Sequence, residues 1–356
     1  MVQTRPFEER DLSEVTALFP RFRETFLGNP WADASLPSWV AHDGGRIVGV
    51  VGVMPRPMRL RGKPVRAAVL SQHGSAAKEL LRAALSGSQE LTLSDSADDA
   101  LRRAWEACGG STVTLYGLQW RRLLRPASFG LGRLPGVAGR AVAMAAAPMA
   151  IAADTYLTRR MGLGRKSALT EQALTGASLC NALEVFGSSY TLRPRYNPAT
   201  LEWLLAHARA RRRDGELHAH MLRQGGRVAG WFLYYLNSGT SKVLQLAARP
   251  GCEDAVLAHL FEHAWRHGSR AIEGRMEPRF AREIGRRHCS LRPSAYVVAH
   301  ARDSELLGAL GTGNAFFSRL EGEGWMHSAC ETRTVSTGPA LPHRFWTRMR
   351  ALPVIS

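Results

Sequence analysis

Three charged side chains late in the chain have types and spacing suited to acid–base chemistry. Glu273 and Arg275 alternate in a predicted strand, Ala271–Arg275, and Glu277 follows two residues later, so all three are expected on one side of the strand. Charged groups at a strand end are costly to bury unless they are paired or used. One carboxylate could deprotonate an amine, and the arginine could hold an anionic group through two hydrogen bonds. The alternative is a structural ion pair.

A glycine-containing loop in the first half could bind an anion. It leads into a helix predicted over residues 79–85, and a helix N-terminus presents unpaired N–H groups that favour negative charge. A glycine there lets the backbone approach a phosphate closely. The alternative is a loop kept for the fold alone. The candidate ligands in this loop are Gln72, His73, Gly74, Ser75, Ala76 and Lys78.

Other reaction types find little support in the sequence. It contains no H-E-x-x-H motif, no Walker loop and no C-x-x-C pair, so we expect no metal site. The five cysteines are odd in number and far apart, which favours a reducing, cytoplasmic setting. The N-terminus is charged from the start, so we expect no signal peptide. Three histidines, His73, His218 and His220, are expected to be ordinary polar residues.

The chain is strongly basic. It has 356 residues with 47 Lys and Arg against 30 Asp and Glu, a formal charge of +17, and only four of the basic residues are lysines. Such a charge attracts phosphate-rich partners, among them a coenzyme A nucleotide, a tRNA or an anionic membrane face. An arginine-rich proteome would produce the same excess. Apart from a short run at residues 209–213 the charges are scattered, which weakens the case for a nucleic-acid partner.

Residues 91–110 have the pattern of a strand followed by a capped helix. Leu91 and Leu93 alternate as on the buried face of a strand, and Ser94, Asp95 and Ser96 can cap the next helix. Apolar residues then recur at helical spacing as far as Cys108, and paired glycines at 109–110 supply a left-handed stop. The segment therefore predicts one βα unit.

This unit resembles the last βα unit of the GNAT acyltransferase superfamily. Its members usually carry Asn and then Tyr-Glu-Lys-x-Gly-Phe where this chain has Asp98 and the run from Trp105 to Gly110. The segment 39–49, WVAHDGGRIVG, is similar to the central GNAT hairpin, so the resemblance spans about the whole first half. The phosphate loop departs from the pattern, because Ser71 stands where Gln or Arg is usual. The resemblance implies an α/β (α+β) fold with mixed sheets.

The second half repeats the first in divergent form. The hairpin sequence at 226–230, GRVAG, matches GRIVG at 45–49. Such a duplication resembles tandem-GNAT proteins and, more distantly, Fem-type transferases. We therefore expect two mixed-sheet domains and two other segments, with these bounds: a GNAT-like domain at 1–126, a helical connector at 127–183, a second GNAT-like domain at 184–330 and a basic tail at 331–356.

The connector contains a run of small apolar residues, AVAMAAAPMAIAA, interrupted by Pro148. It is shorter than the roughly 20 apolar residues that cross a bilayer. We expect a helix packed between the two halves. The alternative is a helix lying on a membrane surface, because basic residues flank the segment 140–166 on both sides.

The resemblance implies an N-acyltransferase that takes acetyl-CoA or another acyl-CoA as substrate and an amine on a small molecule or amino-sugar as acceptor. The phosphate-loop residues, together with Asp98, would then bind the coenzyme, and no metal is expected. Two alternatives stay open: a Fem-like transferase that uses aminoacyl-tRNA, and a non-catalytic scaffold whose phosphate loops are degenerate. Further side chains that could assist acyl transfer are Asp95 and Tyr116 in the first half and Tyr235 and Gln245 in the second.

Overall fold

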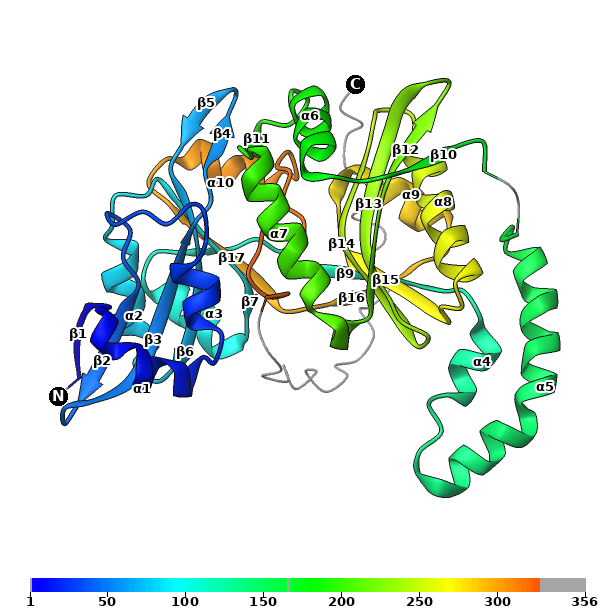
Figure 1. Ribbon diagram of the computed structural model, residues 1–356, viewed down its shortest axis with the longest axis horizontal. Coiled ribbons are helices and arrows are strands. Elements are labelled where there is room, and N and C mark those ends of the chain that lie inside the picture. Colours follow the sequence, from blue (N-terminus) through cyan, green and yellow to red (C-terminus); the bar gives the residue numbers. More distant parts are fainter. Residues whose placement is uncertain (1, 165–166, 327–356) are drawn as a thin grey trace.

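The structure is a computed structural model that describes residues 2–164 and 167–326. Within these residues two seven-stranded sheets stand side by side, and helices α6 (Gly176–Gly187) and α7 (Pro198–Ala210) lie between them (Figure 1). The predicted mixed α/β class is confirmed. The predicted tail at 331–356 lies outside the described residues.

The first sheet is built mainly from the N-terminal half. Its neighbouring strands are antiparallel except for β6 and β7, which are parallel. Helix α1 (Leu12–Leu18) packs on one face, while α2 (Ala77–Leu85) and α3 (Asp99–Ala107) pack on the other. In spatial order the strands are β1 (Gln3–Pro6), β2 (Trp39–Asp43), β3 (Arg46–Pro55), β6 (Ala67–Gly74), β7 (Leu91–Ala97), β17 (Tyr296–Ala301) and β8 (Ser111–Thr112).

The second sheet repeats this plan with residues of the C-terminal half. Its parallel pair is β14 and β15, and helices α8 (Glu253–Arg266) and α9 (Ala281–Arg286) belong to the core on its outer face. In spatial order the strands are β10 (Thr170–Ala173), β12 (Glu216–Gln224), β13 (Arg227–Leu236), β14 (Thr240–Ala248), β15 (Ala271–Arg275), β9 (Leu118–Leu123) and β16 (Ser290–Pro293).

Each sheet takes strands from the other half of the chain. Strand β9 lies within the predicted first domain but pairs with β15 in the second sheet, and β17 pairs with β7 in the first sheet. A small third sheet also joins the halves, because β11 (Leu192–Pro194) pairs with β4 (Met58–Leu60), which pairs with β5 (Lys63–Val65). Helix α10 (Ser304–Gly311) packs on β17. The predicted domain boundaries stay predictions, but the two halves interlock through these strands.

Alternation along β13 divides the second sheet between two hydrophobic cores. Trp231, Leu233 and Tyr235 face the core that contains α6, α7 and α1, whereas Phe232 and Tyr234 face α8. Both sets are almost fully buried, so this strand is apolar on both faces. The shared core beside α6 and α7 fixes the two sheets relative to each other.

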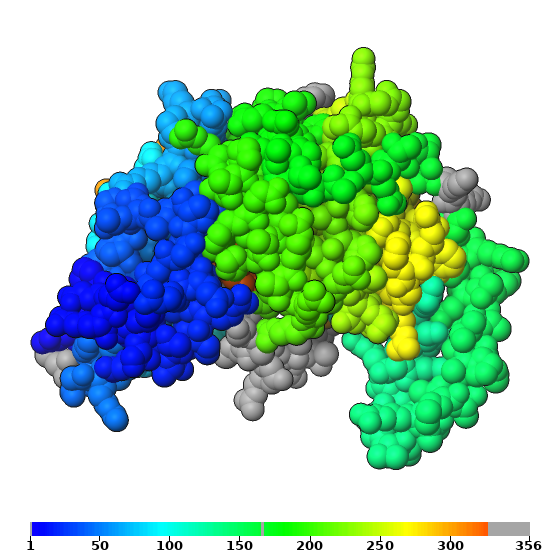
Figure 2. Space-filling view, in the orientation of Figure 1, coloured from blue at the N-terminus to red at the C-terminus, as the bar shows by residue number. Residues whose placement is uncertain are grey.

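The apolar helix of the connector does not lie between the two halves, contrary to the prediction; of the predicted connector, only α6 does. Helix α5 (Gly136–Arg160) forms a hairpin with α4 (Pro126–Leu131) that stands away from the body (Figures 1 and 2). The Asp154 carboxylate of α5 accepts hydrogen bonds from the N–H groups of Ala127 and Ser128 and so caps α4. By length and composition α5 could cross a membrane, and only 6% of its apolar window is buried. Its 25 residues are thus longer and more exposed than the sequence suggested.

Candidate active site between the two sheets

Both sheets open at their parallel strand pair. Strands β6 and β7 pair only from Ala67 to Val69 and from Leu91 to Leu93, although both continue for several residues. Strands β14 and β15 likewise pair only at residues 240–242 and 271–273. Beyond these points the strands have no ladder partner on that side within residues 2–164 and 167–326, which leaves backbone groups available for a ligand or another segment. We call these places the first and second openings.

Residues 316–326, the bridging segment, contact both openings. The Leu320 N–H donates to the carbonyl of Leu244 in β14, at 3.1 Å. The Glu323 carboxyl group accepts hydrogen bonds from the Ser94 hydroxyl at 2.6 Å and from the Asp95 N–H at 3.1 Å, both in β7. The sequence predicted only an aromatic-rich end piece here. The structure makes it the link between the two openings.

A buried ion pair crosses between the two sheets within this region. The Arg275 guanidinium of β15 donates to the Asp95 carboxylate of β7, and both side chains are less than a tenth exposed. Burial acts to raise the pKa of Asp95, but the Arg275 charge and hydrogen bonds from the bridging segment lower it to about 2. Burial and the negative Asp95 raise the pKa of Glu323 well above its usual range, so Glu323 holds its proton. The Arg275 guanidinium is therefore occupied by its ion pair with Asp95.

Glu277 lines a small cavity at the second opening. Burial, followed by the neighbouring Glu321, raises the pKa of Glu277 to about 8, while Arg279, Tyr190 and Arg275 oppose the rise. Its Oε1 atom has no hydrogen-bond partner among the described residues. The cavity is lined by Trp120, Val243, Leu244, Gln245, Leu246, Arg275, Glu277, Ser318 and Arg319. A buried carboxyl group that titrates near neutral pH and has a free oxygen is suited to proton transfer.

Glu273 does not belong to this cavity lining. Its carboxylate accepts hydrogen bonds of 2.6 Å from both Arg121 and Arg292. Burial acts to raise the pKa of Glu273, but these two arginines outweigh it and hold the pKa below its ordinary value. The geometry is that of the structural ion pair that the sequence left open, so the structure groups Arg275 with Glu277 and separates Glu273 from them.

A second small cavity is lined by an unusual arginine, Arg56. Arg56 is 4% exposed, yet its guanidinium nitrogens have no hydrogen-bond partner among the described residues. The side chain lies over the Trp31 ring, and burial lowers its pKa. On the same cavity wall, Glu321 accepts hydrogen bonds from Tyr196 and Gln245 at 2.9 and 2.8 Å. An unpaired buried guanidinium is costly unless a bound anion satisfies it.

The predicted phosphate loop is partly exposed at the start of α2. Gly74 has φ +78°, and an added Cβ would strike the backbone carbonyl of Val48, so glycine is required there. His73 turns inward onto the Phe19 ring, and burial lowers its pKa to about 4. Lys78 is exposed, and Gln72 donates to the Gly74 carbonyl. Ser75, with Ala76 behind it at φ +60°, donates to the Val48 carbonyl.

The remaining predicted residues have structural partners. Asp98 caps α3 by accepting a hydrogen bond from the Leu101 N–H. Tyr116 donates to the carbonyl of Ala315, and Tyr235 donates to that of Ala208. Sequence reasoning missed Arg56, Glu321 and Glu323. The only local signal was the alternation Glu-Gly-Glu-Gly at 321–324, in which Gly322 leaves room for the Asp95 carboxylate.

Comparisons with solved structures identify the architecture. No family model matches the sequence, and no curated protein matches it. A GCN5-related N-acetyltransferase from Anabaena variabilis superposes with a TM-score of 0.52 at 8% identity, covering 87% of this chain and 75% of that chain. This chain has the fold of the GCN5-related N-acetyltransferases (GNATs). The predicted similarity to Fem-type transferases stays a prediction.

Two further structures agree on this GNAT fold. One is a GCN5-related N-acetyltransferase from Kribbella flavida, with a TM-score of 0.51 at 13% identity over 85% of this chain and 73% of that one. The other is a probable N-acyltransferase from Enterococcus faecalis, with a TM-score of 0.51 at 10% identity over 85% and 72%. The matches extend across both halves of this chain, which supports the two-domain GNAT plan.

Proposed function

We propose that this protein transfers an acyl group from acyl-CoA to an amine on a small molecule. The observation that carries the proposal is Glu277, a buried carboxyl group with a free oxygen at an opening of a GNAT-type sheet. In the reaction the thioester C–S bond breaks and an amide C–N bond forms. The amine loses a proton, and the leaving thiolate gains one. A group with a pKa near the working pH serves both transfers.

Glu277 is the proton acceptor in this proposal. Its pKa of about 8 makes it a stronger base than an ordinary carboxylate, and its Oε1 atom has no hydrogen-bond partner among the described residues. Glu273 is less suited to accept a proton, because Arg121 and Arg292 both donate hydrogen bonds to its carboxylate and favour its ionised form. We expect turnover to rise with pH up to about 8 as Glu277 loses its proton.

Arg56 is the residue best placed to bind an anionic part of the acceptor. The sequence suggested Arg275 for this role, but Arg275 is paired with Asp95. Arg56 instead lines the second cavity with its donors unpaired among the described residues. An acceptor that carries a carboxylate or phosphate would satisfy it.

For the coenzyme we favour the start of α2 in the first half. In the exposed first turn of α2, Lys78 offsets the charge of Glu79, so the unpaired N–H groups of the helix start can favour a pyrophosphate. The equivalent helix in the second half, α8, begins with Glu253 and Asp254, and these carboxylates would repel it. The Asp95–Arg275 pair joins the two openings, and Arg275 lines the same cavity as Glu277.

Calorimetric titration with acetyl-CoA is the first test. A Lys78→Glu variant should bind acetyl-CoA at least tenfold more weakly than the native protein, because the substitution reverses a charge beside the helix N-terminus. Lys63→Glu, at the exposed first residue of β5, is the matched control and should bind normally. Equal affinity in both variants would rule out the α2 site.

Turnover tests the role of Glu277. Thiol release from acetyl-CoA is measured with a panel of amino-sugars and other small amines. Glu277→Gln should lower the rate by about 100-fold or more. Glu9→Gln, at a largely exposed position, should not change it. Near-native turnover in Glu277→Gln would refute the assignment.

A non-catalytic scaffold is the second candidate. The specific observation in its favour is that Glu323 of the bridging segment already binds Ser94, Asp95 and Ser96 at the first opening. If the native protein does not bind acetyl-CoA in the titration above, a non-catalytic scaffold becomes the favoured function in place of acyl transfer.

A further inference from the structure

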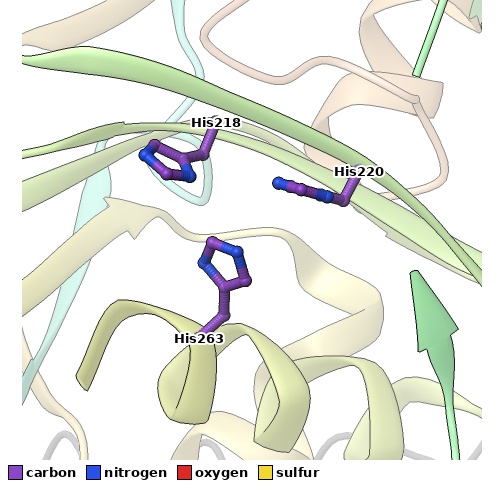
Figure 3. Close-up of side chains that lie close together, drawn as sticks. All are labelled: His218, His220 and His263. Atoms are coloured by element: carbon purple, nitrogen blue, oxygen red, sulfur yellow. The ribbon is translucent and has the colours of Figure 1, made fainter. Parts of the chain in front are cut away.

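Three histidines converge on the outer side of the second sheet, away from the sequence motifs discussed above. His218 and His220 lie on β12, and His263 lies on α8 (Figure 3). One ring nitrogen from each lies within 4.8 Å of the other two. Figure 3 shows the three rings turned toward a common point between the strand and the helix. His263 lies more than 40 residues after His218 and His220 in the sequence, so the three rings meet only through the packing of α8 on the sheet.

Secondary-structure periodicity produces the cluster. Residues 218 and 220 alternate on β12 and so share one face of the sheet. On α8, His259, His263 and His267 recur every four residues and form one stripe on the helix. The side-chain exposed fractions are 14% for His218, 23% for His220 and 4% for His263. The cluster is therefore mostly shielded from solvent, and solvent has access to it beside His220.

The free nitrogens face one another and a carboxylate. Tyr234 and the Nδ1 atom of His263 share a 2.7 Å hydrogen bond, which leaves Nε2 directed at Glu171 Oε2, 3.8 Å away. The Nδ1 atom of His220 lies 3.6 Å from the same oxygen. His218 Nε2 is buried without a hydrogen-bond partner among the described residues. Ring nitrogens arranged in this way can bind one shared metal ion.

The imidazoles are held neutral, as metal ligands must be. Burial lowers the pKa of His218 and of His220. Burial and the neighbouring histidines lower the pKa of His263 to about 2. Neutral imidazole keeps a nitrogen lone pair for a metal, whereas the protonated ring has none.

We propose that His218, His220 and His263 bind one divalent transition-metal ion, with Zn²⁺ as the occupant that fits best. Three imidazoles and one oxygen donor suit tetrahedral zinc. At Zn–N distances of about 2.0–2.1 Å the nitrogens would lie roughly 3.4 Å apart, so the rings need to approach by about 1.4 Å at most. Small side-chain rotations supply that movement. The site is independent of the acyl-transfer proposal.

Glu171 of β10 is the fourth group of this site. Its Oε1 atom is held by His259 Nε2 at 2.6 Å, which directs Oε2 toward His220 and His263. The carboxylate can complete the tetrahedron, and Tyr234 fixes the ring of His263 from the opposite side. A bound ion would join β10, β12 and α8, so it would stabilise the outer layer of the second sheet.

Metal titration of the chelator-treated protein tests the site. We expect one Zn²⁺ per chain by calorimetry, a rise in melting temperature on adding Zn²⁺, and the visible absorption of tetrahedral Co²⁺ when Co²⁺ is added instead. His218→Gln and His220→Gln, at partly exposed positions, should each weaken binding by about 100-fold or more, and Glu171→Gln by about 10–100-fold. His300→Gln, a half-buried histidine on β17 of the other sheet, is the matched control and should bind normally.

The outcomes are distinct. Loss of affinity in the cluster variants, but not in His300→Gln, supports the site. Absence of binding to the native protein, or equal binding in all variants, overturns it. Because two of the three ligands are partly exposed, their variants should fold, and circular dichroism verifies this before titration.

A separate observation concerns helix α5. Its exposed side chains are apolar around much of the helix, and they include Val137, Val142, Met144, Met149, Ile151 and Tyr156, each more than half exposed. Arginines stand near its two ends, at 140 and at 159–160. A helix with this composition is normally buried in protein or in lipid.

We infer that α5 docks on the surface of an anionic lipid bilayer. The basic ends and the +17 charge of the chain complement negative headgroups, and the apolar side chains would enter the acyl boundary. A helix that lies flat on the bilayer surface fits the structure better than one that crosses the bilayer, because the Asp154 carboxylate holds α4 alongside α5.

Vesicle co-sedimentation tests this docking. The protein should bind phosphatidylcholine vesicles that contain phosphatidylglycerol, and binding to pure phosphatidylcholine should be at least tenfold weaker. Met149→Glu should abolish binding, whereas Val185→Glu, at an exposed apolar position on α6, should not. Equal binding by both variants, or a stable dimer that Met149→Glu dissociates in the absence of lipid, would overturn the proposal.

Discussion

Replacement of Glu277 by glutamine should change how stability depends on pH. In the folded protein the pKa of Glu277 is about 8, mainly because of burial, compared with an ordinary value of 4.5. Between these two pH values the unfolded chain has lost the proton and the folded chain keeps it. The free energy of unfolding therefore falls as pH rises, by about 1.4 kcal/mol per pH unit from this one group.

The sign follows from the direction of the shift. A raised pKa gives a contribution that is complete below pH 4.5 and is lost as pH rises through about 8. From pH 5 to pH 8 the loss amounts to roughly 4 kcal/mol in the native protein. Glutamine does not titrate, so Glu277→Gln lacks this loss. The variant should gain about that much stability relative to the native protein across the same range, while its turnover falls.

Urea unfolding at pH 5, 6, 7 and 8, followed by tryptophan fluorescence, measures the effect. The quantity to compare is the difference in unfolding free energy between Glu277→Gln and the native protein at each pH. Glu9→Gln, whose side chain is 78% exposed in the native protein, should follow the native curve. If the Glu277→Gln curve also runs parallel to the native one, Glu277 is not a buried neutral acid, and its proposed role as a base of raised pKa fails with it.

Three further predictions concern stability. Arg275→Met leaves the buried Asp95 carboxylate unpaired and should cost about 3–5 kcal/mol in urea unfolding, whereas Arg103→Met removes an exposed pair and should cost less than about 1 kcal/mol. Trp231→Ala empties a fully buried site and should cost about 3–5 kcal/mol, with a drop in melting temperature as the readout. Glu273→Gln should blunt acid denaturation: because the folded pKa is lowered, its contribution is present above pH 4.5 and is lost as pH falls. A native-like acid transition in that variant would count against the Arg121–Glu273 pair.

Several local elements could be predicted because their causes lie within a few residues. The predicted βα unit at 91–110 is present as β7 and α3, with Gly109 in the left-handed conformation, but the helix cap is Asp98, because the predicted capping residues at 94–96 lie within β7. The paired glycines at 44–45 and 225–226 form the turns of matching hairpins, with positive φ at each. Capping, turn chemistry and side-chain period are short-range properties, so the sequence displays them directly.

The prediction that the apolar connector helix packs between the two halves was wrong for a physical reason. A run of small apolar residues is compatible with burial between domains and with lipid contact, and periodicity does not separate the two. The exposure of α5 depends on where α4 directs the chain, and the capping of α4 by Asp154 decides that.

The sequence by itself determined the mixed α/β class, the repeated hairpin and the spacing that places Glu273, Arg275 and Glu277 close together along the chain. Only the tertiary structure decided which of them could act. Asp95 and Arg275 are separated by 180 residues, and Glu273 is held by arginines 152 and 19 residues away. The exchange of β9 and β17 and the folding of the bridging segment into both openings create these contacts. Such contacts depend on closing long loops of chain, and no local pattern records which loops close.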